Sequence, residues 1–207
     1  MKRAILTVGP MYAGKTTFCR KIRELVPGIT YVRRDDILER HFGSVWVSPY
    51  ECPPAFVERQ LQQAIAMAMG PAAGDSSIVI VDTWNGSPRS RSYYCDLLRR
   101  YGADRVEGWF FITPPEACLA HSFLRDPLED EAPRDREWSR RWREEHVLRD
   151  TKRFYAENPP CPQTEHWFDE VRVIRPLADD PWSWIRPYPG QIPLPGMGSV
   201  LPPPVLL

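Results

Sequence analysis

Short apolar runs alternate with longer amphipathic stretches over most of this chain. Strands are predicted for the apolar runs, which are residues 4–8, 30–32, 78–81, 106–112 and 171–174. Ile78–Val81 is an unbroken β-branched run, typical of a central strand buried on both faces. Helices are predicted between these runs, at residues 15–25, 35–41, 55–69, 89–101 and 115–124. The alternation predicts a three-layer α/β/α fold around a parallel five-stranded sheet.

The composition changes near Pro176, where the alternating pattern ends. The remaining residues are dense in proline and include the run Pro202-Pro203-Pro204, which favours polyproline or irregular structure. We therefore predict one domain over residues 1–176, with a helical lid at about 115–150. A proline-rich tail over residues 177–207 would follow, and the sequence does not identify its partner.

Polar segments follow several of the predicted strands. Right-handed crossovers place the C-terminal ends of parallel strands at one edge of a sheet, where ligands bind in such folds. The segments that fall at this edge are residues 9–16, 35–36, 82–85 and 113–114. Three of them carry polar or charged side chains directly after a strand. The sequence thus predicts the functional site at this edge.

The segment Gly9–Thr16 matches the phosphate-binding pattern G-x-x-x-x-G-K-[ST] in full. In this pattern the backbone N–H groups of the loop and of the following helix converge on phosphate oxygens. Gly14 would allow close backbone approach, Lys15 would reach the β- and γ-phosphates, and Thr16 would ligate Mg²⁺. The pattern arises by chance in about one chain of this length in a hundred, and its place between a strand and a helix favours the functional interpretation.

ATP and Mg²⁺ are therefore the expected cofactors. The residues expected to bind ATP from this loop are Gly9, Tyr12, Ala13, Gly14, Lys15, Thr16 and Thr17. The fold class becomes that of P-loop NTPases of the nucleoside-kinase-like type.

Asp35 and Asp36 follow the second predicted strand, beside the phosphate loop on the same sheet edge. A carboxylate there can accept the proton of an acceptor hydroxyl as it attacks phosphorus in line. Asp is also a favoured helix N-cap, so one of the pair is expected to start the helix. Asp35 is our candidate for the base, and Asp36 for the cap.

Asp82 ends the β-branched strand, where a carboxylate can hold Mg²⁺ directly or through water. The alternative for this residue is a turn-forming role in the segment Asp82–Gly86. We predict that Asp82 and Thr16 form the metal site.

Arg125 ends the predicted helix 115–124, and an arginine-rich stretch follows it. Phosphoryl transfer needs cations on the γ-phosphate and exclusion of water, so a lid is expected there. A solvated arginine-rich helix is the alternative for this stretch. Arg125 is the lid residue that we expect to contact ATP and to act in catalysis, together with Lys15 and Asp35.

Composition narrows the function only slightly. The 27 basic and 27 acidic residues cancel, and the pI is near 6.9, whereas nucleic-acid-binding domains often exceed about 9. Any nucleic-acid contact would need a local basic groove. The five cysteines lack metal-ligand spacing, and no apolar run reaches the length of a membrane span. A cytoplasmic protein without a membrane partner is expected.

These elements resemble the phage-type polynucleotide 5′-kinases, a family of P-loop kinases. The segment Arg33–Asp36 is similar to the family's R-D-D motif, whose first Asp is the general base. Asp82-Thr83-Trp84-Asn85, with Pro88-Arg89 after it, resembles the D-T-N…P-x-R element with Trp84 inserted. Pro114 and Arg125 match the family's lid. The resemblance covers about residues 1–126 and the final strand.

Two departures from the family concern the acceptor. The arginine that grips the acceptor's phosphate, three residues after the catalytic Asp, is replaced by Leu38. A second lid arginine is replaced by His121. The resemblance therefore implies the fold and the kinase chemistry more directly than it implies the substrate.

Three hypotheses remain open from the sequence. The first is a kinase of the 5′-hydroxyl of DNA or RNA, and the second is a kinase of a small alcohol or nucleotide sugar. The third is an ATP-switched binding module with slow ATPase activity, which would need no acceptor base. A basic groove leading to Asp35, which Arg33 would also help to form, would favour the first hypothesis. The expected substrate-binding residues are Arg34, Asp35, Arg40 and Arg89.

Overall fold

A computed structural model describes most of the chain up to residue 178. The described residues are 1–45, 47, 50–70, 77–125, 133–160 and 165–178. Within residues 133–139 only the backbone helix is described. The tail predicted for residues 177–207 therefore lies almost entirely outside the described residues.

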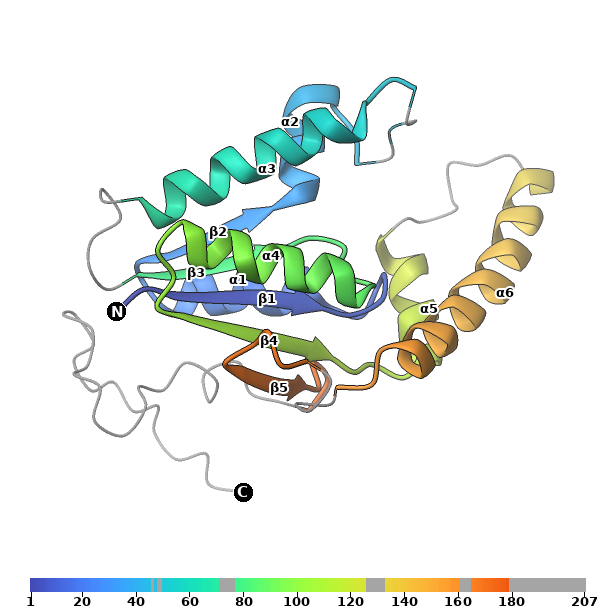
Figure 1. Cartoon of the computed structure of the whole chain (residues 1–207). Coiled ribbons are helices and arrows are strands. Elements are labelled where there is room, and N and C mark those ends of the chain that lie inside the picture. Colours follow the sequence, from blue (N-terminus) through green and yellow to red (C-terminus); the bar gives the residue numbers. More distant parts are fainter. Residues whose placement is uncertain (46, 48–49, 71–76, 126–132, 161–164, 179–207) are drawn as a thin grey trace.

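Five parallel strands form the central sheet, in the order β2-β3-β1-β4-β5 (Figure 1). The strands are β1 (Arg3–Val8), β2 (Ile29–Arg33), β3 (Ile78–Asp82), β4 (Arg105–Phe111) and β5 (Glu170–Ile174). Every neighbouring pair is parallel, so the predicted sheet is confirmed. The β-branched strand β3 lies between β1 and β2 and is buried along nearly all its length.

Six helices connect or follow the strands in the described residues. They are α1 (Lys15–Leu25), α2 (Arg34–Phe42), α3 (Pro54–Met69), α4 (Pro88–Arg100), α5 (Pro115–Arg125) and α6 (Pro133–Glu157). The first five agree with the predicted helices to within a residue or two at each end. Helix α6 was expected only as part of a lid, without defined bounds.

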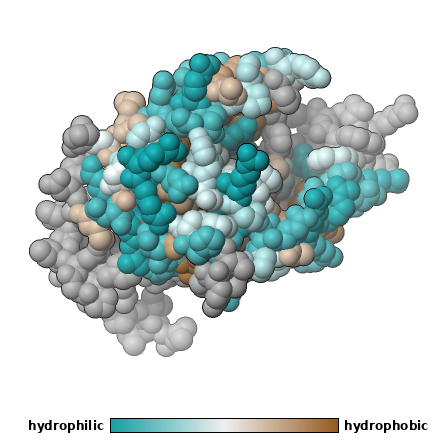
Figure 2. All heavy atoms as spheres, in the orientation of Figure 1, coloured by the Kyte–Doolittle hydropathy of each residue, from teal (hydrophilic) through white to brown (hydrophobic). Residues whose placement is uncertain are grey.

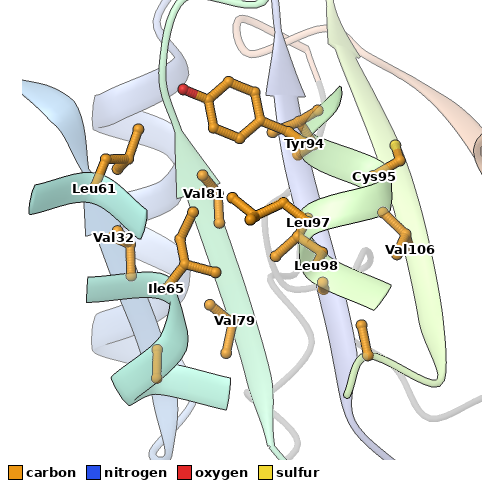
Figure 3. Packing of buried hydrophobic residues seen from close by; sticks show 14 of the residues in the cluster. Val32, Leu61, Ile65, Val79, Val81, Tyr94, Cys95, Leu97, Leu98 and Val106 are labelled. Carbon is orange, nitrogen blue, oxygen red and sulfur yellow. The ribbon is translucent and has the colours of Figure 1, made fainter. Parts of the chain in front are cut away.

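Hydrophobic side chains fill both faces of the sheet, which confirms the three-layer architecture. On one face, α3 and α4 pack over β3 and its neighbours through residues such as Leu61, Ile65 and Leu98 (Figure 3). On the other face, Phe18 and Ile22 of α1 pack beside Ile80. Because alternate strand residues point to opposite faces, Ile80 joins one cluster while Val79 and Val81 join the other.

Helix α6 is anchored by its second half. Val147, Thr151 and Phe154 are buried at 8%, 2% and 9% exposure, and their spacing puts them on one helical face. The helix also packs against α5 (Figure 1). Residues 140–146 are mostly exposed. The C-terminal part of α6 is thus tied to the domain, while its N-terminal part extends away from the sheet.

A buried ion pair joins α4 to the segment that follows α6. The guanidinium of Arg91, which is 1% exposed, donates from Nε to Glu165 Oε2 at 2.8 Å and from Nη1 to Asn158 Oδ1 at 2.8 Å. Nη1 also donates to the carbonyl oxygen of Asn85 at 3.0 Å. One side chain therefore holds the turn after β3, helix α4 and the end of α6 together.

The surface is mainly hydrophilic on the face shown in Figure 2, where apolar patches are small. Among the described residues, no helix combines the length and apolar character needed to cross a bilayer.

Candidate active site

A cleft of about 1320 Å³ opens at the C-terminal edge of the sheet. It is bounded by the phosphate loop, the ends of β2 and β3, and parts of α3 and α5. Three of the four sheet-edge segments singled out in the sequence contribute lining residues: the phosphate loop, Asp35, and Asp82–Trp84. The Thr113–Pro114 segment does not line the cleft, although Thr113 Oγ1 supports the loop by donating to Ala13 O at 2.8 Å.

The phosphate loop has the backbone that its sequence predicts. Gly14 has φ 84° and Tyr12 has φ 60°, so both adopt the left-handed region, and Gly14 is the N-cap of α1. A side chain at Gly9 would place its Cβ 3.1 Å from Phe111 Cβ. Gly9 therefore lets the loop leave β1 close to β4, although it does not itself line the cleft.

Lys15 lies folded within the loop. Its Nζ donates to the carbonyl oxygens of Gly9 at 3.0 Å and of Pro10 at 2.8 Å. Burial lowers the pKa of Lys15, while the negative charges of Asp82 and Asp35 act in the opposite direction. The ammonium group is thus held by two carbonyl oxygens of the loop and feels the charge of two carboxylates. A phosphate can replace the carbonyl oxygens as its partner.

Asp82 accepts hydrogen bonds from three hydroxyl groups. Thr16 Oγ1 donates to Oδ2 at 3.0 Å, Tyr31 Oη donates to the same oxygen at 2.5 Å, and Thr7 Oγ1 donates to Oδ1 at 2.8 Å. Burial, together with the charge of Asp82, raises the pKa of Tyr31 well above its ordinary value, so the phenol stays a donor. Asp82 is 6% exposed, and its carboxylate is fixed on both oxygens.

The Thr16–Asp82 pair suits Mg²⁺, which takes hard oxygen ligands. Mg²⁺ in phosphoryl-transfer sites is held by one or two carboxylates together with substrate phosphates and water. One carboxylate and one hydroxyl side by side meet this requirement. No cluster of three or more His, Cys, Asp or Glu side chains that could hold a metal is found in the described part of the chain.

Arg33 binds both aspartates of the R-D-D segment. Its Nη2 lies 2.9 Å from Asp35 Oδ2, and its Nη1 lies 2.7 Å from Asp36 Oδ1. Although burial opposes the charged form, Asp35 and Asp36 hold the pKa of Arg33 above its ordinary value. Arg33 is 7% exposed. It therefore positions the two carboxylates, and it also lines the cleft.

The expectation that Asp36 caps α2 is wrong. The N-cap residue is Arg33, and no side chain caps that end. Asp35 and Asp36 lie within the first helical turn, where the helix dipole favours negative charge. The carboxylate of Asp36 instead accepts a hydrogen bond from the guanidinium of Arg33.

Arg125, at the end of α5, reaches the carboxylate of Asp35. Its Nη2 is 3.9 Å from Asp35 Oδ2, and its guanidinium lies over the ring of Tyr12 at 6.0 Å from the centroid. His121, one helical turn earlier, donates from Nδ1 to the carbonyl oxygen of Tyr12 at 2.9 Å. Helix α5 is thus held to the phosphate loop at two points.

The structure brings together most of the predicted site residues. Those that line the cleft are Tyr12, Ala13, Gly14, Lys15, Thr16, Thr17, Arg34, Asp35, Asp82 and Arg125. Arg40 and Arg89 are exposed and lie outside the cleft lining. Of the four arginines considered for a basic groove in the sequence, Arg33 and Arg34 line the cleft, whereas Arg40 and Arg89 do not.

Several lining or supporting residues were not anticipated as site residues. Tyr31 contacts the predicted metal ligand from a strand 51 positions away, and no spacing in the sequence links the two. Glu58 and Tyr94 line the cleft from α3 and α4. Trp84 was noted only as an insertion, although a tryptophan two residues after a sheet-edge aspartate was a usable signal.

Comparisons with known proteins confirm the fold. A candidate kinase from Chloroflexus aurantiacus superposes with a TM-score of 0.62 at 15% identity, covering 89% of this chain and 94% of that one. A fungal RNA kinase superposes with a TM-score of 0.50 at 17% identity, covering 86% and 77%. The organisation expected from the resemblance to P-loop kinases is present in both.

A chain of the Pnkp1/Rnl/Hen1 complex is 24% identical over 63% of the present chain, with a TM-score of 0.45. The present chain spans only 40% of that longer relative. No curated protein gives a significant match.

The sequence model of the AAA domain family matches residues 5–144. This segment holds the phosphate loop, Asp35, Asp82 and Arg125, and it makes up more than half of the chain. The protein therefore belongs to the AAA domain family.

Proposed function

We propose that this protein is an ATP- and Mg²⁺-dependent kinase that transfers the γ-phosphoryl group of ATP to an acceptor hydroxyl. The observation that carries the proposal is the position of Asp35. It lines the same cleft as Lys15, Thr16 and Asp82. Its carboxylate is contacted by Arg33 of β2 and by Arg125 of α5. A protein that only binds and slowly hydrolyses ATP has no need of such a carboxylate.

Each side chain has a role that follows from its position. The loop amides and Lys15 would bind the ATP phosphates, and Thr16 and Asp82 would hold Mg²⁺, which offsets negative charge on the phosphate oxygens when bound. Asp35 would accept the proton of the acceptor hydroxyl while the oxygen of that hydroxyl attacks the γ-phosphorus. The bond from the γ-phosphorus to the bridging oxygen would break, and ADP would leave. Arg125 would neutralise charge on the transferred group and exclude water from it.

Two classes of acceptor are proposed. The resemblance to polynucleotide 5′-kinases supports the 5′-hydroxyl of DNA or RNA. A small alcohol is supported by a specific observation, because only two of the four arginines expected to feed a basic groove, Arg33 and Arg34, line the cleft. Arg40 and Arg89 lie outside the cleft, and Arg33 is engaged by two aspartates.

The test is transfer of label from γ-labelled ATP to 5′-hydroxyl oligonucleotides and to a panel of small alcohols. We expect a labelled product that depends on Mg²⁺ and is lost in Lys15→Ala, because the γ-phosphate then lacks its pre-placed cation. Label released only as inorganic phosphate, with every acceptor present, would favour the ATP-switched module instead.

A further inference from the structure

One wall of the cleft is built without cations. It comes from the segment before α3, from α3 itself, from the turn after β3 and from α4. We call it the acceptor wall. Its residues are Val45, Pro54, Val57, Glu58, Leu61, Thr83, Trp84 and Tyr94. A single carboxylate is the only charged group in this set.

Trp84 is the most exposed aromatic side chain of the acceptor wall, at 60% exposure. It is followed by a glycine whose absent side chain makes room for the indole. A Cβ at Gly86 would lie 2.3 Å from Trp84 Cζ2. The ring is therefore laid against the backbone of its own turn, which restricts its motion and leaves the ring accessible in the cleft. A fixed, accessible indole is suited to stacking against a flat ring.

Glu58 is held in place by neutral donors. Tyr94 Oη donates to Oε2 at 2.8 Å, and Tyr93 Oη and Gln62 Nε2 donate to Oε1 at 3.0 and 3.1 Å. The hydroxyl of Tyr94 points from α4 toward α3 (Figure 3). Burial, reinforced by Glu58, raises the pKa of Tyr94 and keeps it a donor.

The carboxylate of Glu58 retains capacity to bind a ligand. Oε2 accepts one bond from the described residues, whereas a carboxylate oxygen can accept two. No ion pair to Glu58 is formed by the described lysines and arginines. A negatively charged, pre-positioned acceptor in a cleft wall selects ligands that present N–H donors, and it repels phosphate.

A grip for an acceptor phosphate is missing at the place where the related kinases have one. Leu38 occupies that position and is 2% exposed, packed in the core. Arg40 is exposed but does not line the cleft. The cations that line the cleft come from α1, β2, α2 and α5 and not from the acceptor wall; they are Lys15, Arg20, Lys21, Arg33, Arg34 and Arg125. Contacts on the acceptor wall itself are therefore made to the ring and its donors.

We infer that the acceptor wall binds a planar nitrogenous ring with N–H donors, of the nucleobase type, which stacks on Trp84 and donates to Glu58. The hydroxyl to be phosphorylated would belong to the sugar attached to that ring, and a phosphate on that sugar would be dispensable. This inference rests on the proposed kinase function. The ring could come from a free nucleoside or from the 5′-terminal nucleoside of a strand.

Four acceptors separate these cases when transfer from γ-labelled ATP is measured. They are cytidine, cytidine 3′-phosphate, a 5′-hydroxyl oligonucleotide that begins with cytidine, and the ring-free alcohol ribitol. We expect kcat/KM for cytidine to equal that for its 3′-phosphate within about threefold, and to exceed that for ribitol by about a hundredfold. Equal use of the oligonucleotide would identify the strand end as a source of the ring, and its rejection would identify the free nucleoside.

Variants link the result to the acceptor wall. Trp84→Ala and Glu58→Gln should each raise KM for cytidine about tenfold, and they should raise it more than they raise KM for ATP. Trp84→Phe keeps a flat ring and should stay within about threefold of the parent protein. Trp142→Ala on α6, outside the cleft lining, is the matched control and should leave all four acceptors unaffected.

The inference would be overturned by a 3′-phosphate or a strand being required for transfer, or by ribitol being used as well as cytidine. Either result would leave the proposed kinase function standing. Failure to phosphorylate any of the acceptors, while ATP is still bound and is hydrolysed in a way that Lys15→Ala abolishes, would overturn both the inference and the proposed kinase function.

Discussion

Arg125 and Asp35 meet across the cleft, with 3.9 Å between Arg125 Nη2 and Asp35 Oδ2. The first residue ends helix α5, and the second lies in the first turn of α2. Since Arg125 also lies over the ring of Tyr12, one guanidinium contacts the candidate base and the phosphate loop. The end of α5 and the start of α2 are thereby electrostatically linked.

Arg125→Ala should lower kcat by about 10²-fold, the usual loss when one charge-stabilising donor is removed from a transition state. Arg125→Lys keeps the charge without the planar guanidinium, so its kcat should lie between those of the parent protein and of Arg125→Ala. Steady-state kinetics with saturating ATP measures the effect. A normal kcat in Arg125→Ala would assign the residue to lid packing alone.

Asp35→Asn should lower transfer by about 10²–10⁴-fold, the usual contribution of a positioned base. ATP affinity should be nearly intact, because the base acts only when an acceptor is present. Titration calorimetry with a nonhydrolysable ATP analogue and a transfer assay together measure the split. Asp36→Asn is the control, since Asp36 contacts the same arginine but does not line the cleft. Equal, small effects at both positions would remove the base assignment.

Tyr31→Phe should raise the Mg²⁺ concentration needed for half-maximal activity by about tenfold. The change removes one of three hydroxyl donors to Asp82, and a hydrogen bond to a charged group contributes about 1.5–3 kcal/mol. Calorimetry of Mg²⁺ binding in the presence of a nonhydrolysable ATP analogue gives a readout independent of turnover.

Tyr101→Phe is the matched control for Tyr31→Phe, because Tyr101 packs beside the core away from the cleft. An identical Mg²⁺ dependence in Tyr31→Phe and in the parent protein would show that Thr16 and Thr7 alone orient Asp82.

Arg91→Ala should destabilise the fold by about 3–5 kcal/mol, because it leaves the buried carboxylate of Glu165 without its partner. Arg99→Ala removes a comparable arginine from a largely exposed pair with Asp169, so its cost should be about 0–1 kcal/mol. Urea unfolding followed by circular dichroism compares the two. Similar midpoints for both variants would contradict the structural importance of the Arg91 network.

Deletion of residues 179–207 should leave phosphoryl transfer measurable, because every residue of the candidate site precedes them. Leu177 lines the cleft and Pro176 lies close to Gly14, so the cut must fall after residue 178. A folded but inactive truncation would contradict a kinase domain that ends before residue 179.

The sheet could be predicted because its central strands are uniform in character. Ile78–Val81 is buried on both faces, and a parallel strand in that position needs an unbroken apolar run. Helix α6 lacked a comparable signal. Its buried stripe has Thr151 between Val147 and Phe154 and lies only in the second half of a strongly charged helix. The anchoring of α6 is a tertiary effect that periodicity did not reveal.

The site residues also divide into those that the sequence predicted and those that depend on tertiary packing. Lys15, Thr16 and Gly14 belong to one contiguous motif, so local sequence was enough to predict their placement. Arg33 was expected in a groove because its charge was visible, whereas its burial against Asp35 and Asp36 depends on how β2 enters α2. Tyr31 and Glu58 reach the cleft only through the order of the strands and the packing of α3.

Strand β2 also fixes a distance. Tyr31 and Arg33 are two positions apart and project from the same side of the strand, roughly 6–7 Å from each other along it. One contacts the candidate metal carboxylate and the other the candidate base, so the spacing between these two centres is built into a single extended segment. The acceptor wall draws nothing from that segment. Redesign of acceptor choice on this scaffold can therefore be confined to α3 and residues 83–86, and the reactive geometry can be left as it is.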